Sequence, residues 1–540
     1  MPQLLDWKSS DWVQRSVYHT WLENPPAGLS SIKPPSVADW PAVMKQRKAF
    51  ADEHIDRSTL TDRLLQSHRR RCAPSPVLEN IEALRSADAF LVIAGQQPGL
   101  LGGPLLTLYK AMQAIVEARR LTQNTAYHFI PAFWNASEDH DLSEVDAATW
   151  VDAQGEQITH RWQGKPSSAP YYELPAQSIP VNEIAEQLGA QYPEMAEAAK
   201  LAQEIPAMVA QAHSLADAFD ALLWRWLGQS GLLIIRPEDD AVRLAARSIL
   251  ARELEAPLQS NRSVAQAGHI LQEHGAQPQI QQREDRAAFF DLNGQQRRAL
   301  YWRSGQFVDD NGATLSPSEM RTRLENAPHR FSPSAVLRPV VQEAVLPTAA
   351  SIVGPSELAY HFLLDGIYRQ HETPRPALIP RSGMTLLESR DVRHLEKLGL
   401  SMHDLRHDRA ALMKRWVQRN HPVSMDAALQ AMAQTFDHMR ARLAQTDPTG
   451  IPPLDSNQKR IEKWLHDSEH LTLRREARRH GEIEAQIKRL QHSLLPGGRL
   501  QERVLCPLQF WARHGDAFFS TLLDLMQQIP NGEHVFVRLP

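Results

Sequence analysis

The sequence has little cysteine, no marked excess of either charge and no long hydrophobic run. Its 540 residues include only Cys72 and Cys506, too few for a disulfide framework or for a structural zinc site with four clustered ligands. The formal net charge of -4 excludes the strongly basic surface typical of nucleic-acid-binding proteins. No window approaches the roughly 18 apolar residues of a membrane span, and the N-terminus lacks the pattern of a signal peptide. These absences predict a cytoplasmic protein that binds neither nucleic acid nor membrane.

The composition is that of a globular protein, with 42% hydrophobic and 23% charged residues. A chain of this length predicts two or three structural units. The first 85 residues are polar and favour short helices broken by proline pairs. We expect residues 1–400 to form a core with helical or mixed insertions at about 140–230 and 240–330. Residues 401–495 are then a helical hairpin, and residues 496–540 return to the core.

A βαβ unit near residue 90 sets the expected fold class. Phe90–Ala94 is a short apolar run typical of a buried parallel strand, and His128–Trp134 predicts a second strand. Apolar residues between Leu101 and Ile115 recur every three or four positions, which indicates an amphipathic helix whose first turn suits Pro104. The unit predicts an α/β protein with a parallel sheet. Further strands are predicted at Leu232–Ile235, Val336–Val341, Ala350–Val353, Leu378–Ile379 and Val535–Val537.

The pattern changes to heptads after about residue 400. Apolar residues from Met425 to Leu443 step by four and three, and a second charged helix reaches about Leu495. The proline-rich stretch 446–453 separates the two helices, and Pro496–Gly498 ends the second. Two long helices joined by a turn predict an antiparallel coiled-coil hairpin.

A glycine-rich loop follows the first predicted strand. It runs from Gly95 to Pro104, directly before a helix whose N-terminus would offer N–H groups to an anion. Its candidate ligand-binding residues are Gly95, Gln96, Gln97, Gly99, Gly102 and Gly103. Lys110, about two turns into the helix, could reach a phosphate. The alternatives are a structural turn and a solvent-exposed lysine, because the spacing fits neither the dinucleotide fingerprint nor a Walker loop.

Four consecutive ionisable residues follow the second predicted strand. Glu138, Asp139, His140 and Asp141 could supply a general base, orient a histidine or hold a magnesium ion. Ligands of open α/β sheets bind beyond the carboxyl ends of the strands, where both loops emerge. The alternative is a helix N-cap with acidic residues in its first turn. Zinc is disfavoured because no second histidine lies at a suitable spacing.

Weaker candidates lie downstream. Arg338 could hold a carboxylate in a bidentate pair, with a structural salt bridge as the alternative. Gly354 with Glu357 marks another strand–turn–helix junction, where the alternative for Glu357 is a helix cap. For Arg381 and for Gln501–Arg503 a surface or packing role is favoured.

Taken together, these segments resemble the cysteine-adding enzyme family of bacillithiol biosynthesis (BshC). The resemblance spans about residues 90–515, in the family's order. It rests on Ala94–Leu105 with Lys110, Phe133–Asp141 with Glu144, Leu337–Gln342, Gly354–Tyr360, Thr385–Glu388 and Leu500–Val504.

The resemblance implies a Rossmann-like parallel-sheet core with connecting-peptide insertions, plus a coiled coil that supports a homodimer. The implied reaction adds L-cysteine to glucosaminyl-malate, with ATP as the partner that activates the carboxylate and without zinc; whether ADP or AMP forms stays open. Under this hypothesis Asp139 and His140 act on the attacking amine beside Glu138 and Asp141, and Lys110 stabilises phosphate charge. Two rival hypotheses are a metal-dependent hydrolase or transferase and a non-catalytic coiled-coil assembly protein.

Overall fold

The computed structural model describes most of the chain. The described residues are 3–5, 12, 21, 25–27, 29, 32–162, 169–278, 280, 283–293, 296–420 and 425–540. Much of the polar stretch predicted to favour helices before residue 32 therefore lies outside the described residues.

The centre of the body is a five-stranded parallel sheet with the order β13-β12-β2-β3-β6. Its strands are β2 (Ala89–Gln96), β3 (His128–Asn135), β6 (Leu233–Ile235), β12 (Thr348–Val353) and β13 (Ala377–Pro380). Every residue of β12 is buried, as a strand covered on both faces requires. The predicted α/β class with a parallel sheet is confirmed, and so are the predicted strands that correspond to these five.

One predicted strand is wrong. The segment Val336–Val341 contains the start of a helix, α13 (Arg338–Val345), rather than a strand. Its apolar run reads as a strand, but Pro339 fits the first turn of a helix, where the missing N–H costs nothing. Val340, Val341 and Val345 then form one buried helical face.

Helices surround the sheet. Before β2 lie α2 (Trp40–His54), α3 (Arg57–Arg70) and α4 (Ser75–Ala83). The predicted amphipathic helix is α5 (Leu105–Asn124), whose N-cap is Pro104 and which packs on β2, β3 and β12. After β12 come α14 (Pro355–His361) and α15 (Asp365–Gln370).

Two insertions interrupt the parallel sheet. The first holds the hairpin β4 (Ala147–Val151) with β5 (Gln157–Arg161), then α6 (Val181–Gln191), α7 (Ala196–Gln211) and α8 (Leu215–Leu227). The second holds the helices α9 (Asp240–Arg243), α10 (Arg247–Glu255), α11 (Gln259–Glu273) and α12 (Pro317–Asn326). Its antiparallel sheet joins β7 (Arg286–Asn293), β8 (Gln296–Arg303), β9 (Gln306–Asp309), β10 (Thr314–Leu315) and β11 (Phe331–Pro333).

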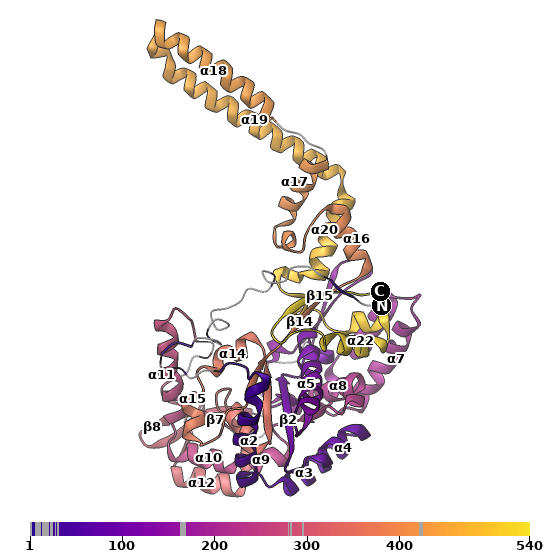
Figure 1. Ribbon diagram of the computed structural model, residues 1–540, viewed down its shortest axis with the longest axis vertical. Coiled ribbons are helices and arrows are strands. Elements are labelled where there is room, and N and C mark those ends of the chain that lie inside the picture. Colours follow the sequence, from indigo (N-terminus) through magenta and orange to yellow (C-terminus); the bar gives the residue numbers. More distant parts are fainter. Residues whose placement is uncertain are drawn as a thin grey trace.

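The C-terminal strand joins a different sheet from the central one. β15 (His534–Arg538) lies between β1 (Gln3–Leu5) and β14 (Gly383–Leu387), so the two chain ends are side by side (Figure 1). The preceding helices α21 (Leu508–His514) and α22 (Ala517–Met526) pack against α7 and α5 of the body.

An arm of helices extends away from the body (Figure 1). It starts at a neck of α16 (Ser389–Leu398), α17 (Arg409–Asn420) and α20 (Gly481–Leu494), which has an apolar core of its own. The predicted coiled-coil hairpin is formed by α18 (Asp426–Thr446) and α19 (Ile451–Arg479), which contact each other. The second helix was predicted to reach about Leu495, but it ends at Arg479, because the backbone at His480 is not helical and α20 packs in the neck instead. None of the helices in the described part of the chain is long and apolar enough to cross a membrane.

Candidate active site

The central sheet has one point where its strand order reverses. The chain runs outward from β2 through β3 to β6, then returns to add β12 and β13 on the other side of β2. Loops at such a point diverge and leave a crevice at the carboxyl ends of the strands. A cavity of about 990 Å³ opens there, and its wall includes Gly95 at the end of β2 and Gly354 after β12.

The first residues of the glycine-rich loop face the cavity, whereas its later glycines form a backbone turn away from it. Gly95, Gln96 and Gln97 line the cavity, and a Cβ at Gly95 would lie 3.2 Å from the Cβ of Trp134. Gly99, Gly102 and Gly103 do not belong to the wall. Gly102 and Gly103 have φ values of +90° and +69°, so these glycines serve the backbone turn rather than direct contact with a ligand in the cavity.

Lys110 lies across the crevice between β2 and β12. Its ammonium group donates to the carbonyl of Gly95 at 2.8 Å and to Oε1 of Gln96 at 2.9 Å, and it pairs with Glu357 at 2.6 Å. The same Glu357 oxygen accepts from the N–H of Gly354 at 2.8 Å. Burial lowers the pKa of Lys110, and the Glu357 carboxylate opposes that shift. The ammonium thus holds three acceptors, so a phosphate would reach it only by replacing one of them.

The four ionisable residues after β3 point in different directions. Glu138 is buried in an ion pair with Arg243 and accepts a hydrogen bond from Ser332 at 2.7 Å. Asp141 lies outside the cavity wall and caps the next turn, accepting from the N–H of Ser143 at 3.1 Å. Because the carboxylates diverge, they do not form a shared metal site. Among the described residues, no group of three His, Cys, Asp or Glu side chains could hold a metal ion.

Asp139 and His140 line the cavity side by side. The N–H of His140 donates to the Asp139 carboxylate at 2.9 Å, and the ring Nδ1 lies 3.6 Å from the same oxygen. Partial burial lowers the pKa of His140, and the Arg297 guanidinium lowers it further. The imidazole is therefore neutral at pH 7 and able to accept a proton.

Arg338 lines the cavity from the first turn of α13. It donates to Oε1 of Gln342 and to the hydroxyl of Tyr360, both at 3.1 Å, and lies over the ring of Trp134. These contacts fix the guanidinium at the wall.

The sequence prediction missed most of the arginines of the cavity. Arg286 and Arg297 come from the antiparallel sheet and stand over the ring of Phe290, at 4.8 and 3.9 Å from its centroid. Arg381, treated as a packing residue, and Arg503 also reach the wall. The alternation of side chains along β7 and β8 could have shown which arginines share one face of the antiparallel sheet. It could not have shown that this face borders the cavity at the end of β2.

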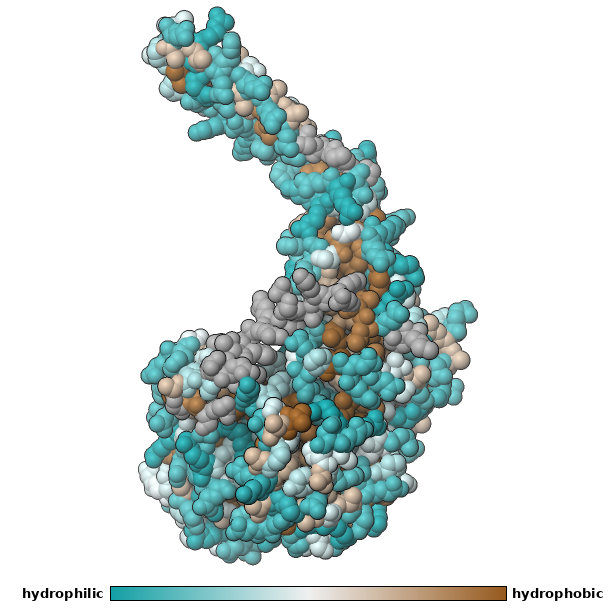
Figure 2. Space-filling view, in the orientation of Figure 1, coloured by the Kyte–Doolittle hydropathy of each residue, from teal (hydrophilic) through white to brown (hydrophobic). Residues whose placement is uncertain are grey.

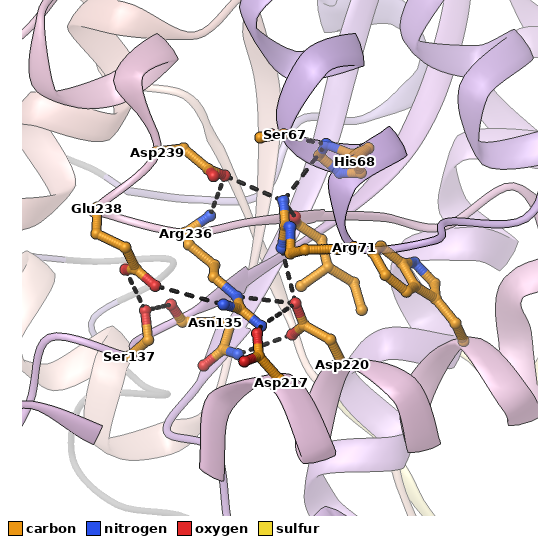
Figure 3. A network of polar contacts seen from close by, with 12 residues as sticks. Ser67, His68, Arg71, Asn135, Ser137, Asp217, Asp220, Arg236, Glu238 and Asp239 are labelled. Atoms are coloured by element: carbon orange, nitrogen blue, oxygen red, sulfur yellow. Dashed lines mark hydrogen bonds and ion pairs between the residues drawn. The ribbon is translucent and has the colours of Figure 1, made fainter. Parts of the chain in front are cut away.

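A buried polar network holds the loop after β3 from behind (Figure 3). Asn135 donates to Asp220 at 2.8 Å, and Ser137 donates to Glu238 at 2.5 Å. Asp220 also pairs with Arg71 and Arg236, each at 2.7 Å. The network anchors Asn135 and Ser137, which lie just before the Glu138–Asp141 turn, and so keeps that turn at the cavity.

Fold and cavity together define an α/β protein with a Rossmann-like sheet and a cavity rich in cationic side chains at its switch point. Two family models match the chain, "Bacillithiol biosynthesis BshC, N-terminal Rossmann-like domain" over residues 23–382 and "Bacillithiol biosynthesis BshC, C-terminal coiled-coil domain" over residues 384–539. The chain belongs to the BshC family.

Similar proteins carry one name, "Putative cysteine ligase BshC". The protein of Salinibacter ruber is 28% identical over 492 residues, which cover 90% of each chain. That of Anoxybacillus flavithermus is 29% identical over 89% of this chain and 91% of its own. That of Solibacter usitatus is 30% identical over 84% of each chain.

Proposed function

We propose that this chain is a ligase that joins the carboxyl group of L-cysteine to the amine of glucosaminyl-malate, with ATP as the activating co-substrate. The observation that carries the proposal is that family segments far apart in the sequence meet around one cavity. They contribute Gly95–Gln97, Asp139 with His140, Arg338, Gly354–Glu357 and Arg503. The names of the relatives support the part of the proposal that makes the chain a cysteine ligase.

The proposed reaction needs a base that removes a proton from the attacking amine. A carboxylate resists attack because its oxygen is a poor leaving group, and ATP supplies the activation that changes this. The amine nitrogen then bonds to the carboxyl carbon, the activated oxygen leaves with its bonding electrons, and the nitrogen loses a proton. His140 is the group that we propose takes this proton. The Asp139 carboxylate accepts from its backbone N–H and lies 3.6 Å from the ring Nδ1, where it would stabilise the protonated imidazole. Glu138 and Asp141 act indirectly, because one is paired with Arg243 and the other caps a turn.

The wall suits the negative charge of a nucleotide. Arg286, Arg297 and Arg338 line it, and guanidinium groups bind phosphate with paired hydrogen bonds. The carboxylates diverge, so we propose that any Mg²⁺ enters bound to the phosphates, as it commonly does in nucleotide sites. The same divergence weighs against the rival metal-dependent hydrolase.

We also propose that the chain forms a homodimer through the arm. Met439 on α18 and Ile461, Trp464 and Leu471 on α19 are 47%, 40%, 65% and 51% exposed. A hairpin of two helices leaves these apolar side chains in water, and a second copy of the arm would cover them.

A small-thiol profile of cells with and without the gene tests the reaction. Loss of bacillithiol with accumulation of glucosaminyl-malate is the expected result. Complementation with His140→Ala should lower thiol production by about 10²–10⁴-fold, the usual range for a general base. His54→Ala, at an exposed histidine remote from this wall, is the matched control. An unchanged thiol profile on deletion would refute the proposal.

A further inference from the structure

The segment Arg499–Cys506 contributes to the wall of the cavity and is held from two sides. The N–H of Leu105, the first residue of α5, donates to the backbone of this segment at 2.9 Å. The segment in turn donates to the carbonyl of Thr149 on β4 at 2.8 Å. Gln501 clamps it to β14, accepting from the N–H of Leu386 and donating to its carbonyl, both at 2.8 Å. The backbone that carries Arg499 and Arg503 is therefore fixed at the cavity wall.

This end of the cavity has more positive than negative charge. Arg381 pairs with Glu502 through hydrogen bonds that include one of 3.0 Å, and both side chains are buried. Arg499 and Arg503 line the same cavity, and within the part of the chain that the structure describes neither guanidinium group makes a hydrogen bond or a close ion pair. Arg499 is exposed and Arg503 is half-buried. Burial and the nearby Arg381 cation lower the pKa of Arg503, and the Glu502 carboxylate opposes that shift. The guanidinium groups of Arg381, Arg499 and Arg503 thus share the one carboxylate of Glu502, which leaves an excess of positive charge.

The start of α5 adds to this positive field. Pro104, its N-cap, and Leu106 lie on the cavity wall, so the N-terminal end of a 20-residue helix meets the ligand space. That end carries the positive pole of the helix dipole.

We propose that Arg499, Arg503 and the N-terminus of α5 form a subsite for a dianionic group. Resting on the proposed function, the group is either the dicarboxylate of the malate moiety or the phosphates of the nucleotide. Both arginines lie in the region that matches the C-terminal coiled-coil family model, whereas α5 lies in the Rossmann-like region. The C-terminal region thus completes the substrate site as well as forming the arm.

Calorimetric titration of the full chain tests the subsite. The probes are glucosaminyl-malate, ATP, and the fragments L-malate and pyrophosphate. Arg503→Ala should raise the Kd of one substrate and of its matching fragment by about 10–100-fold, as expected for a lost charged hydrogen-bond pair. Arg503→Lys should recover part of the affinity, since lysine keeps the charge but not the fork geometry. The substrate affected identifies the source of the dianion.

Arg161→Ala is the matched control. Arg161 lines the same cavity but is 60% exposed and paired with Asp146 at 2.7 Å, so its loss should change each Kd by less than about twofold. Unchanged affinity of Arg503→Ala for every probe that the wild-type chain binds would overturn the subsite and leave the ligase proposal standing. Binding of a fragment that depends on Arg503, without binding of either whole substrate, would keep the subsite and remove the ligase proposal. Failure of the wild-type chain to bind any probe would overturn both.

Discussion

The body and the arm of this protein both contain ion pairs between arginine and aspartate, but the pairs differ in their exposure to solvent. In the body, the Asp220 side chain is 2% exposed and is shared by Arg71, Arg236 and Asn135 (Figure 3). In the arm, Arg440 pairs with Asp437 and Asp455, yet all three side chains are 36–69% exposed. A buried charge that loses its partner cannot be rescued by water, whereas an exposed one can. Ion pairs of equal geometry should therefore differ widely in their effect on stability.

Apolar residues show the same contrast. β12 is buried along its whole length, whereas Phe436 is the one buried residue among the side chains of α18 that the structure describes. Figure 2 shows the hairpin of α18 and α19 as largely hydrophilic with scattered apolar side chains. The body completes its core within one chain, whereas α18 and α19 leave apolar side chains exposed, which the proposed homodimer would cover.

The largest effect should come from breaking the buried network. Asp220→Ala removes the acceptor shared by the buried Arg236, the largely buried Arg71 and the amide of Asn135. We expect this to lower the free energy of unfolding by about 3–5 kcal/mol. Urea denaturation followed by tryptophan fluorescence measures it. A loss below about 1 kcal/mol would show that the buried ion pairs of the body contribute no more to stability than the exposed pairs of the arm.

Acid should destabilise the body through His68. Burial lowers its pKa to about 3, while the unfolded histidine titrates near its ordinary value of 6.5. Below pH 6.5 the unfolded state binds more protons, so the stabilisation present above that pH is lost as pH falls toward 3. We expect a loss of about 2 kcal/mol between pH 7.5 and pH 5. Denaturation of His68→Gln should show a flatter pH profile, whereas the exposed control His54→Gln should keep the wild-type slope.

The next effect concerns the arm and its partner. Trp464→Glu places a charge on an apolar position that is 65% exposed in one copy, and it should weaken dimerisation by about 1–3 kcal/mol. Sedimentation equilibrium over a concentration series measures the shift. The neighbouring exposed Lys463→Glu makes a larger change in charge and should leave the dimer constant nearly unchanged. Equal effects of the two substitutions would show that Trp464 is not at the interface.

The smallest effect should come from the exposed pairs of the arm. Arg440→Ala removes ion pairs with Asp437 and Asp455, and we expect the free energy of unfolding to change by less than about 1 kcal/mol. The same urea experiment as for Asp220→Ala measures it. A loss of stability comparable to that of Asp220→Ala would show that exposed and buried ion pairs contribute equally to the stability of this protein.

Helices and strands whose sequence follows one clear periodicity were predictable. A segment whose residues favour both a strand and a helix was not. The strand β2, the helix α5 and the heptads of α18 each follow a single local pattern. The stretch Val336–Val341 carries β-branched residues beside a proline that suits a helix start, and the helix formed. The C-terminal strand was predictable, but its pairing with β1 and β14 depends on contacts between residues far apart in the sequence.

The sequence by itself determined the α/β class, the coiled-coil hairpin and the family, because each depends on local spacing or on ordered motifs. It also located the residues that line the cavity at Gly95–Gln97, Asp139, His140 and Arg338. Only the tertiary structure decided that Lys110 is paired with Glu357 and that Glu138 is paired with Arg243. It also decided that Asp141 lies outside the wall and that Arg503 joins it. The physical reason is that the partners of a charge and its access to solvent depend on which distant segments the fold brings beside it.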